Sequence, residues 1–215
     1  MRQSPDPDPL EKLYAGLSLS PPVPPHRPPA LVIMTGLPGS GKTHLARLLC
    51  ERAPFTLVGS DPVRAALFEN PTYSPAENRT VYEAVDALLW RLLRERRDVV
   101  YDAVNLSERR RAGLRRLALD AGARPITVLT VAPEPVIWLR LAERRGAPKA
   151  PGDSEADWEV YKKLAPRQER IAHQHIRVDT TQDLIPALEA ILREVRRPFP
   201  GPPPQNRNPS PPQMR

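Results

Sequence analysis

Two kinds of apolar pattern alternate along the middle of the chain. Continuous runs of apolar and β-branched residues lie at residues 30–34, 55–60, 98–104, 125–131 and 176–178. Short runs without polar interruption are typical of strands that are buried on both faces. The pattern therefore predicts five strands.

The segments between these runs repeat their apolar residues at helical spacing. After residue 43, leucines recur at positions 45, 48 and 49, and residues 81–92 place five apolar side chains on one face. Further helices are expected at residues 63–68, 107–121, 133–146, 154–170 and 184–195. Strands that alternate with helices predict an α/β fold, in which helices cover both faces of a parallel sheet.

Proline is concentrated at the two ends of the chain. Of the 29 prolines, nine lie in residues 1–30 and eight in residues 198–215. Such segments hold few bulky apolar residues, so burial cannot offset the entropy of ordering them. We expect disordered tails at 1–29 and 198–215 around one domain at 30–197, and little loss of stability when the tails are removed. The alternative within the first tail is a short helix at 10–17.

The charge of the chain is compatible with a phosphate-rich partner but does not identify one. The net charge is +7, and arginines cluster at residues 91–97 and 107–116. Basic surfaces favour nucleic acids and other polyanions. Only five of the 32 basic residues are lysines, however, and GC-biased coding would give the same excess of arginine.

Cysteine content and hydropathy bear on the location of the protein. The single cysteine, Cys50, excludes a disulfide within the chain and a cysteine-based zinc site, which fits a reducing compartment. The amino terminus has no signal-peptide pattern, and no apolar run reaches the length of a membrane span. We expect a cytoplasmic protein that has no membrane partner.

Residues 36–43 read GLPGSGKT and stand between the first predicted strand and a helix. They match G-x-x-x-x-G-K-[ST], the Walker A pattern of phosphate-binding loops. The expected nucleotide-binding residues are Gly36, Leu37, Pro38, Gly39, Ser40, Gly41, Lys42 and Thr43. In this pattern the lysine bridges the β- and γ-phosphates and the hydroxyl ligates Mg²⁺. The loop therefore predicts binding of ATP with Mg²⁺.

Two aspartates follow predicted strands at the edge of the sheet where the loop lies. Asp61 comes after the second strand and can accept a proton from an attacking hydroxyl, or can cap the next helix. Asp102 ends the third strand, where P-loop proteins place a carboxylate that holds Mg²⁺. Thr43 and Asp102 are the predicted metal ligands.

Together, GLPGSGKT, GSDPVR and VVYDAVNLSERRR resemble the motifs of small P-loop kinases. The similar groups are stand-alone kinases labelled AAA-type ATPases, the kinase domain of polynucleotide 5′-hydroxyl kinases and, more distantly, zeta-toxin kinases. The resemblance covers about residues 30–195. It implies a P-loop NTPase fold, with a five-stranded parallel sheet and a helical lid at about 140–167. Val104 departs from the family pattern, which has threonine there.

The resemblance also implies roles for individual residues. Asp61 matches the general base of these kinases, and Arg64 would face the acceptor or its phosphate. Arg140 and Arg144 match an R-x-x-x-R lid that closes on the triphosphate, which gives five expected catalytic residues: Asp61, Lys42, Arg64, Arg140 and Arg144.

Other polar residues have more than one interpretation. Asn105 orients the acceptor or caps the next helix. Most of Arg109, Arg110 and Arg111 are expected on the solvated surface of that helix. Trp158 and Tyr161 are expected to pack their own helix rather than to stack on a base.

The predicted function is transfer of the γ-phosphate of ATP to a hydroxyl acceptor. The acceptor is a small molecule or the 5′-OH end of a polynucleotide. The alternative is an ATP-binding or ATPase scaffold without an acceptor. A ring or motor ATPase is disfavoured, because alanine rather than an acidic residue follows Asp102.

Overall fold

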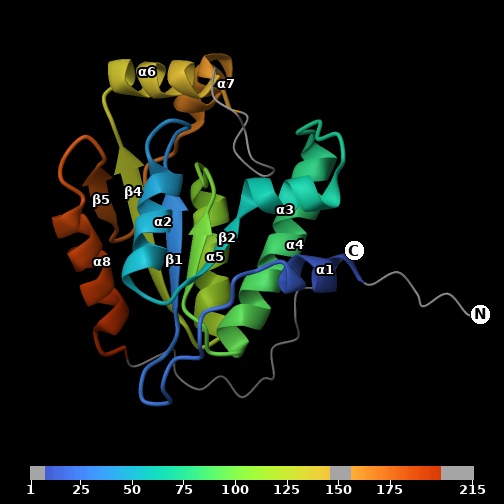
Figure 1. The fold of residues 1–215 in the computed structure, drawn as a ribbon, viewed down its shortest axis with the longest axis vertical. Helices are drawn as coiled ribbons and strands as arrows, with labels where there is room; N and C mark the ends of the chain where they lie inside the picture. The colour runs from blue at the N-terminus through green and yellow to red at the C-terminus, as the bar shows by residue number, and fades with distance from the viewer. Residues whose placement is uncertain (1–7, 146–155, 200–215) are drawn as a thin grey trace, which may run out of the picture.

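A computed structural model describes residues 8–145 and 156–199 and is built around one parallel sheet (Figure 1). The strands are β1 Ala30–Thr35, β2 Thr56–Gly59, β3 Val99–Asp102, β4 Arg124–Val131 and β5 Ile176–Asp179, in the order β2-β3-β1-β4-β5. All four strand pairs are parallel. The predicted α/β fold with a five-stranded parallel sheet is confirmed.

Helices cover both faces of the sheet. They are α1 Pro9–Ala15, α2 Lys42–Arg52, α3 Ser60–Leu67, α4 Pro75–Arg94, α5 Glu108–Asp120, α6 Glu134–Arg145, α7 Trp158–Leu164 and α8 Ile185–Arg196, with a 3₁₀ turn, η1, at Ala165–Arg167. Side chains of β1 alternate between two cores. Leu31 and Ile33 pack with residues of α4 and α5, while Val32 and Met34 pack with residues of α2 and α8. Burial on both faces explains the continuous apolar run of this strand.

The second helix of the predicted lid is shorter than expected. α7 begins at Trp158, where the Asp157 side chain accepts a hydrogen bond from the Val160 N–H, and it passes into the 3₁₀ turn at Ala165. Pro166 in this turn has no N–H for a regular helix. Residues 146–155, which belong to the expected lid, lie outside the described residues.

The segment before β1 is folded, so the prediction of a disordered first tail is wrong for residues 8–29. α1 is capped by the Asp8 side chain, and Leu13 is buried in the same core as α4 and α5. Further along, the Ser20 N–H donates to the Thr56 hydroxyl oxygen of β2 at 2.9 Å. Residues 1–7 and 200–215 lie outside the described residues, so the prediction is untested there.

Arginines at the end of α4 hold the proline-rich part of this segment. Arg96 donates to the backbone carbonyls of Pro24 and Arg27 at 2.7 and 2.6 Å, and Arg97 donates to the Ser20 carbonyl. Arg27 in turn forms a two-bonded ion pair with Asp98. The segment is ordered by hydrogen bonds to its backbone, which compensate for its small number of apolar side chains.

We expect Leu13→Ala to destabilise the protein, because Leu13 is only 9% exposed and its loss leaves a cavity beside α4. Replacing a buried leucine by alanine typically lowers the free energy of unfolding by about 2–5 kcal/mol. Chemical denaturation measures the change. Leu19→Ala is the control, since Leu19 is 39% exposed and should change stability little. Equal stabilities for wild type and Leu13→Ala would show that α1 does not dock in solution.

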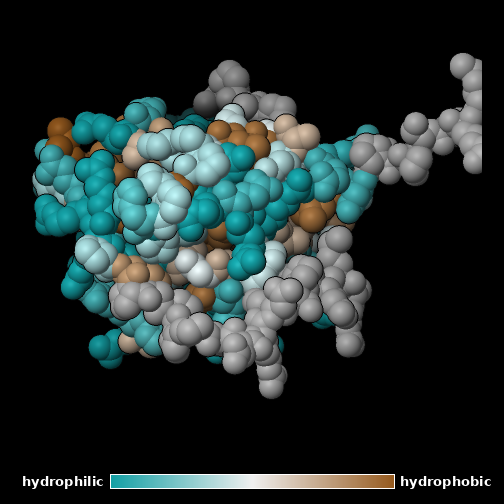
Figure 2. Space-filling view, turned by 90° about the horizontal axis from the view of Figure 1, so that it is seen from below, coloured by the Kyte–Doolittle hydropathy of each residue, from teal (hydrophilic) through white to brown (hydrophobic). Residues whose placement is uncertain are grey.

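Hydrophilic residues cover most of the described surface on the side that Figure 2 shows, below the sheet as drawn in Figure 1. Hydrophobic residues occur there as small separate areas. Among the helices of the described residues, none combines the length and the hydropathy that a membrane-spanning segment requires.

Candidate phosphate-binding and catalytic site

The phosphate-binding loop connects β1 to α2 at the carboxyl edge of the sheet (Figure 1). Gly36 and Gly41 have φ angles of +146° and +87°, which favour glycine. A Cβ atom on Gly36 would lie 2.6 Å from the Thr130 carbonyl oxygen, and one on Gly41 would lie 2.9 Å from Thr180. Both glycines are therefore required by backbone conformation and by close packing against β4 and the end of β5.

The amino end of α2 supplies positive potential to the loop. Its N-cap residue is Gly41, and no side chain caps the helix. The first N–H groups of a helix have no acceptor within the helix, and the helix dipole adds partial positive charge at this end. An end without a side-chain cap suits the binding of a phosphate.

Lys42 lies among the charged residues of the site. It is buried, and its Nζ donates to the Leu37 carbonyl oxygen at 2.9 Å. Burial lowers the pKa of Lys42, the charges of Asp102 and Asp61 oppose this shift, and the charge of Arg144 adds to it. The amine is thus close enough to both aspartates and to α6 to respond to their charges.

A cavity of about 430 Å³ brings most of the predicted site residues together. Its lining comprises Pro38, Gly39, Gly41, Lys42, Thr43, His44, Ser60, Asp61, Asp102, Ala103, Val104, Arg140, Glu143, Arg144 and Thr180. Other residues of the phosphate loop do not line the cavity but fix the loop to neighbouring elements. Ser40 shares a hydrogen bond of 2.7 Å with Thr130 on β4, and Leu37 packs against Ile137 and Leu141 of α6.

Asp61 and Asp102 reach this cavity from neighbouring strands. Asp102 is the last residue of β3 and is in register with Gly59, the last residue of β2. α3 follows without a loop, so Asp61 lies in its first turn, and the N-cap residue is Gly59. Asp61 is thus not the N-cap residue of this helix, contrary to one of its two predicted roles.

Arg64 is not part of the cavity, contrary to the sequence-based expectation. It is 6% exposed and is ion-paired with Glu77 of α4, while it donates to the Asn78 side chain at 2.6 Å. Its guanidinium also lies 4.5 Å from the centre of the Tyr73 ring. The Glu77 carboxylate at the start of α4 thus binds Arg64 outside the phosphate site, and this ion pair connects α3 to α4.

Glu77 is the counter-charge that sequence reasoning missed. Ser74-x-x-Glu77 has the spacing of a capping box, and the Glu77 N–H donates to the Ser74 hydroxyl oxygen at 3.3 Å. The carboxylate also accepts from the Thr72 N–H and hydroxyl and from the Tyr73 N–H. The capping-box pattern could have indicated a buried carboxylate here, but it could not name Arg64 as the partner.

We expect Glu77→Gln to reduce stability at neutral pH and to matter less in acid. Burial raises the pKa of Glu77, but hydrogen bonds from Thr72 and Arg64 outweigh it and lower the pKa to about 2. Because the folded state holds the ionised carboxylate more strongly than the unfolded chain does, Glu77 stabilises the fold at any pH above its ordinary pKa of 4.5. This stabilisation is lost as the pH falls from 4.5 toward 2. The difference in melting temperature between wild type and Glu77→Gln should therefore stay constant from pH 7 to about pH 4.5 and shrink as the pH falls from there toward 2. A difference that stays constant over this whole range would contradict the ionic role.

α6 lies over the phosphate loop and carries both lid arginines into the cavity. Arg140 donates to the Thr180 hydroxyl and carbonyl oxygens at 2.8 and 2.9 Å, and to the Gly39 carbonyl oxygen at 3.3 Å. The Thr180 hydroxyl donates to the Ser40 carbonyl oxygen at 3.0 Å. Arg140 thus connects α6, the loop and the end of β5, while Arg144 lines the cavity. Thr180 was missed, and its position directly after a strand was the only signal.

The aromatic residues of α7 pack the lid helices together. The Trp158 and Tyr161 rings are stacked, with centres 4.6 Å apart. Tyr161 is buried in a small core with Ile137 and Leu141 of α6. Both aromatic residues thus have the packing role that the sequence predicted.

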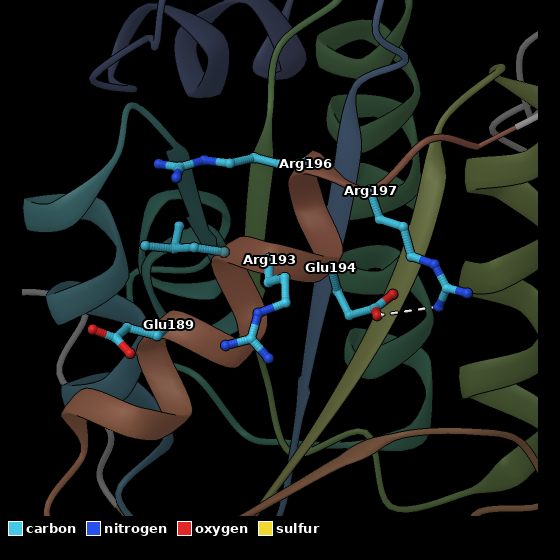
Figure 3. Close-up of a pocket in the computed structure, with 6 residues that line it drawn as sticks. Glu189, Arg193, Glu194, Arg196 and Arg197 are labelled. Carbon is cyan, nitrogen blue, oxygen red and sulfur yellow. Dashed lines mark hydrogen bonds and ion pairs between the residues drawn. The ribbon is translucent and has the colours of Figure 1, made fainter.

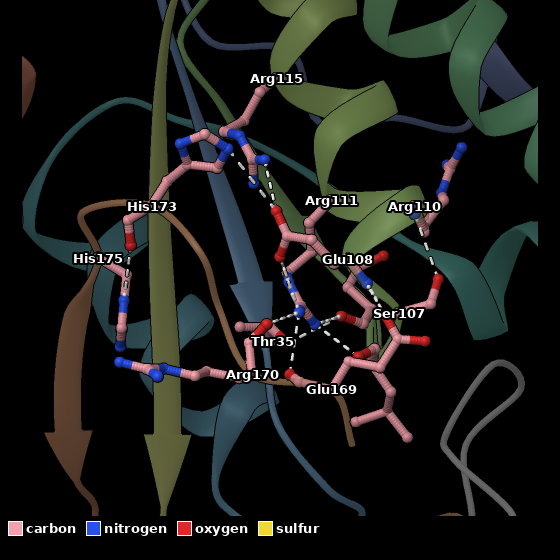
Figure 4. A network of polar contacts seen from close by, with 12 residues as sticks. Thr35, Ser107, Glu108, Arg110, Arg111, Arg115, Glu169, Arg170, His173 and His175 are labelled. Atoms are coloured by element: carbon pink, nitrogen blue, oxygen red, sulfur yellow. Dashed lines mark hydrogen bonds and ion pairs between the residues drawn. The ribbon is translucent and has the colours of Figure 1, made fainter. Parts of the chain in front are cut away.

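Arg111 anchors the chain that leaves the lid (Figure 4). Its side chain is fully buried and donates to the carbonyl oxygens of Asn105, Leu106, Glu169 and Arg170 at 2.6–3.0 Å. It also pairs with Glu108 at 2.9 Å. The segment after η1 is thereby fixed to the connection between Asp102 and α5.

The other polar residues of this connection are structural as well. Arg110 pairs with Asp86 at 2.7 Å, and only Arg109 of the three arginines is exposed, so the expectation of a mostly solvated cluster is wrong. The Asn105 amide donates to the Met34 carbonyl oxygen at 2.8 Å, and the cap of α5 is Ser107. The predicted capping role of Asn105 is therefore wrong, while its predicted role in orienting the acceptor stays a prediction.

A larger hollow of about 780 Å³ lies along α8 (Figure 3). It is lined by Glu189, Leu192, Arg193, Glu194, Arg196 and Arg197. No residue of the phosphate loop contributes to it, and its charged side chains include the Arg197–Glu194 pair at 3.4 Å. Size alone therefore does not make it the functional site.

The loop, the sheet and the helices on both faces define a P-loop NTPase. A family model described as an AAA domain matches residues 31–182, and the chain belongs to this family. A search of curated proteins finds no match.

Solved structures of small P-loop kinases and of related nucleotide-binding proteins have the same fold. The Mycobacterium tuberculosis APS kinase CysC, in complex with AMPPNP and APS, has a TM-score of 0.58 at 18% identity, covering 79% of this chain and 98% of that one. A gluconokinase from Sinorhizobium meliloti 1021 has a TM-score of 0.53 at 21% identity, covering 79% and 90%. Chaetomium thermophilum Kti12, in complex with ADP-AlF3, has a TM-score of 0.60 at 19% identity, covering 77% and 96%. Because these identities are below 25%, the structural similarity establishes the fold alone.

Proposed function

We propose that the protein binds ATP with Mg²⁺ and transfers the γ-phosphate to a hydroxyl acceptor, either a small molecule or the 5′-OH end of a polynucleotide. One observation carries the proposal: a single cavity is lined by the phosphate-loop lysine, by Asp61 and Asp102 beside it, and by two arginines of the helix above the loop. A phosphate loop alone is compatible with any NTPase. A carboxylate outside the loop and arginines on a lid helix are the additional groups that transfer to a second substrate uses.

The donor groups in the cavity fit Mg²⁺. Thr43 provides a hydroxyl, and Asp102 provides a carboxylate at the end of β3. Mg²⁺ is typically held by one or two carboxylates together with phosphate oxygens and water. No cluster of three or more His, Cys, Asp or Glu residues that could hold a metal occurs among residues 8–145 and 156–199, so the phosphates of the nucleotide would complete the coordination. When bound, Mg²⁺ neutralises charge on the phosphates.

We assign the following roles to the protein residues, and their positions around the cavity support this assignment. The N–H groups at the start of α2 and the Lys42 amine hold the β- and γ-phosphates. Asp61 accepts the proton of the attacking hydroxyl. Arg140 and Arg144 face the phosphates from α6 and stabilise the charge that develops on them during transfer. Arg64 has no direct part in this mechanism.

The test is a transfer assay with γ-labelled ATP. The purified protein is offered 5′-OH oligonucleotides, nucleosides, sugars, aminoglycosides and other alcohols, and the labelled product is identified. Label on one class of acceptor supports the proposal. ATP binding without label on any member supports the alternative, an ATP-binding scaffold, and label only on inorganic phosphate supports an ATPase.

A further inference from the structure

The segment before β1 forms one wall of a second cavity, of about 550 Å³. Lys12, Leu13, Gly16, Leu17 and Ser18 line this wall. The opposite side consists of residues from α2, β2 and α3, including Cys50, Phe55, Leu57, Val63 and Ala66. The volume lies within the usual range for sites that bind small molecules.

The two cavities meet at three residues. Thr43, Asp61 and Asp102 line both of them. A molecule in the second cavity can therefore present a group to Asp61 while a triphosphate occupies the first. Phosphate transfer requires the donor and the acceptor to be held close together, and a carboxylate at their junction can accept the proton of the attacking hydroxyl.

The wall formed by the first segment is a fixed part of the fold. Tyr14 donates to the Glu95 carboxylate, and the Arg91 guanidinium lies 3.6 Å from the centre of the Tyr14 ring. Arg91 also pairs with Glu11 at 2.7 Å. The Ser20 N–H also donates to the Thr56 hydroxyl oxygen of β2, so contacts at residues 11, 14 and 20 hold the segment that contains the wall.

We propose that this second cavity is the acceptor site, and that the acceptor is a small alcohol with an apolar body. The inference rests on the proposed phosphotransfer. Most of the lining side chains are apolar, with Lys12 and Arg47 as the basic residues and the shared aspartates at the junction. A polynucleotide end would need an open groove with basic residues along its length. The apolar lining matches instead a compact ligand that buries carbon surface and carries a hydroxyl at one end.

The chemical step balances within this arrangement. The acceptor oxygen forms a bond to the γ-phosphorus as the bond from that phosphorus to the bridging oxygen breaks. The electron pair of the broken bond leaves with ADP. The hydroxyl proton passes to the Asp61 carboxylate.

A matched pair of substitutions on α3 tests the site. Ala65 and Ala66 are both exposed, but only Ala66 lines either of the two cavities. We expect Ala66→Trp to narrow the acceptor cavity and to raise the KM for the alcohol about tenfold or more, with ATP affinity unchanged. Ala65→Trp should leave both constants near wild type. Equal KM values for the two variants would overturn the assignment even where transfer itself occurs.

Cys50 provides a second readout that does not depend on catalysis. It is the single cysteine of the chain, it lines this cavity, and burial raises its pKa to about 11. Its slow alkylation by iodoacetamide at mildly alkaline pH can be followed by mass spectrometry. Phenylpropanol, hexanediol, glucose and a 5′-OH oligonucleotide are the probes, each with the non-hydrolysable analogue AMPPNP and Mg²⁺.

We expect an apolar alcohol both to protect Cys50 and to receive label from ATP. Label on glucose or on the oligonucleotide without protection of Cys50 overturns the acceptor site and leaves the proposed phosphotransfer intact. Protection of Cys50 only by compounds that receive no label, while another compound is labelled without protecting it, also overturns the acceptor site, because the cavity then binds something other than the acceptor. A lack of label on every compound, with ATP bound, counts against the proposed function instead.

Discussion

Lys42→Ala is expected to abolish measurable phosphate transfer and to weaken ATP binding. The amine lies within the influence of both aspartates and of Arg144 at the centre of the cavity, and in the proposed complex it contacts the β- and γ-phosphates. Removal of one preorganised donor to developing charge usually costs about 10²–10³ in kcat. Loss of a full positive charge next to a triphosphate should cost at least as much. Isothermal titration with ATP and Mg²⁺, together with the labelled transfer assay, measures both effects.

Two further variants separate this effect from unfolding. Lys42→Met retains the apolar stem and the volume of the buried side chain, so its melting temperature should stay close to that of wild type. Lys163→Ala removes an exposed lysine on α7 that lines neither cavity, and it should change neither ATP affinity nor transfer. Wild-type affinity and turnover in a folded Lys42→Ala would remove the basis of the whole functional assignment.

The strands could be predicted because a strand that is buried on both faces has a continuous run of apolar residues, which can be read directly from the local sequence. β1 is buried along its whole length, and its apolar run defined it to within one residue. The phosphate loop was equally local, since eight consecutive residues specify both the turn and the start of α2. Asp61 and Asp102 could be placed because parallel strands end at one edge of a sheet.

The remaining features depend on partners that are distant in the sequence. α1 is docked through Leu13 and through Arg91 in the last turn of α4, and a proline-rich composition gives no sign of either contact. Arg64 and Arg111 are charged helix residues, a type that is usually exposed to solvent. Both are buried, and both bind partners on other elements of the fold. In each case the arginine binds a carboxylate or carbonyl oxygens that only the fold brings near.

This difference also explains which part of the site sequence reasoning missed. The residues proposed to contact phosphate belong to contiguous motifs, whereas one wall of the second cavity is formed by the segment that was expected to be disordered. Its wall residues Leu13 and Leu17 carry no motif. Substrate selection in this protein therefore depends, in our proposal, on contacts that tertiary structure creates, while phosphate binding depends on a local pattern.

Asp61→Asn is expected to reduce transfer by about 10²–10⁴, the usual contribution of general-base catalysis. The amide keeps the size of the side chain but cannot accept the hydroxyl proton. ATP binding should remain, because Asp61 lies on α3 outside the phosphate loop. Rates measured with saturating ATP and the identified acceptor test the chemical step, and ATP titration tests binding.

The competing role for Asp61 is a favourable interaction with the amino end of α3, since it lies in the first turn of that helix. Loss of such a charge would cost about 0.3–1 kcal/mol of stability and leave transfer unchanged. Glu134→Gln is the matched control, because it removes a carboxylate from the first turn of α6 without touching either cavity. If the two variants lose similar small amounts of stability and both retain full transfer, Asp61 is not the base. If Asp61→Asn also loses ATP binding, the carboxylate belongs to the metal site instead. A large loss of transfer in Asp61→Asn alone, with ATP bound normally, assigns the proton to this residue.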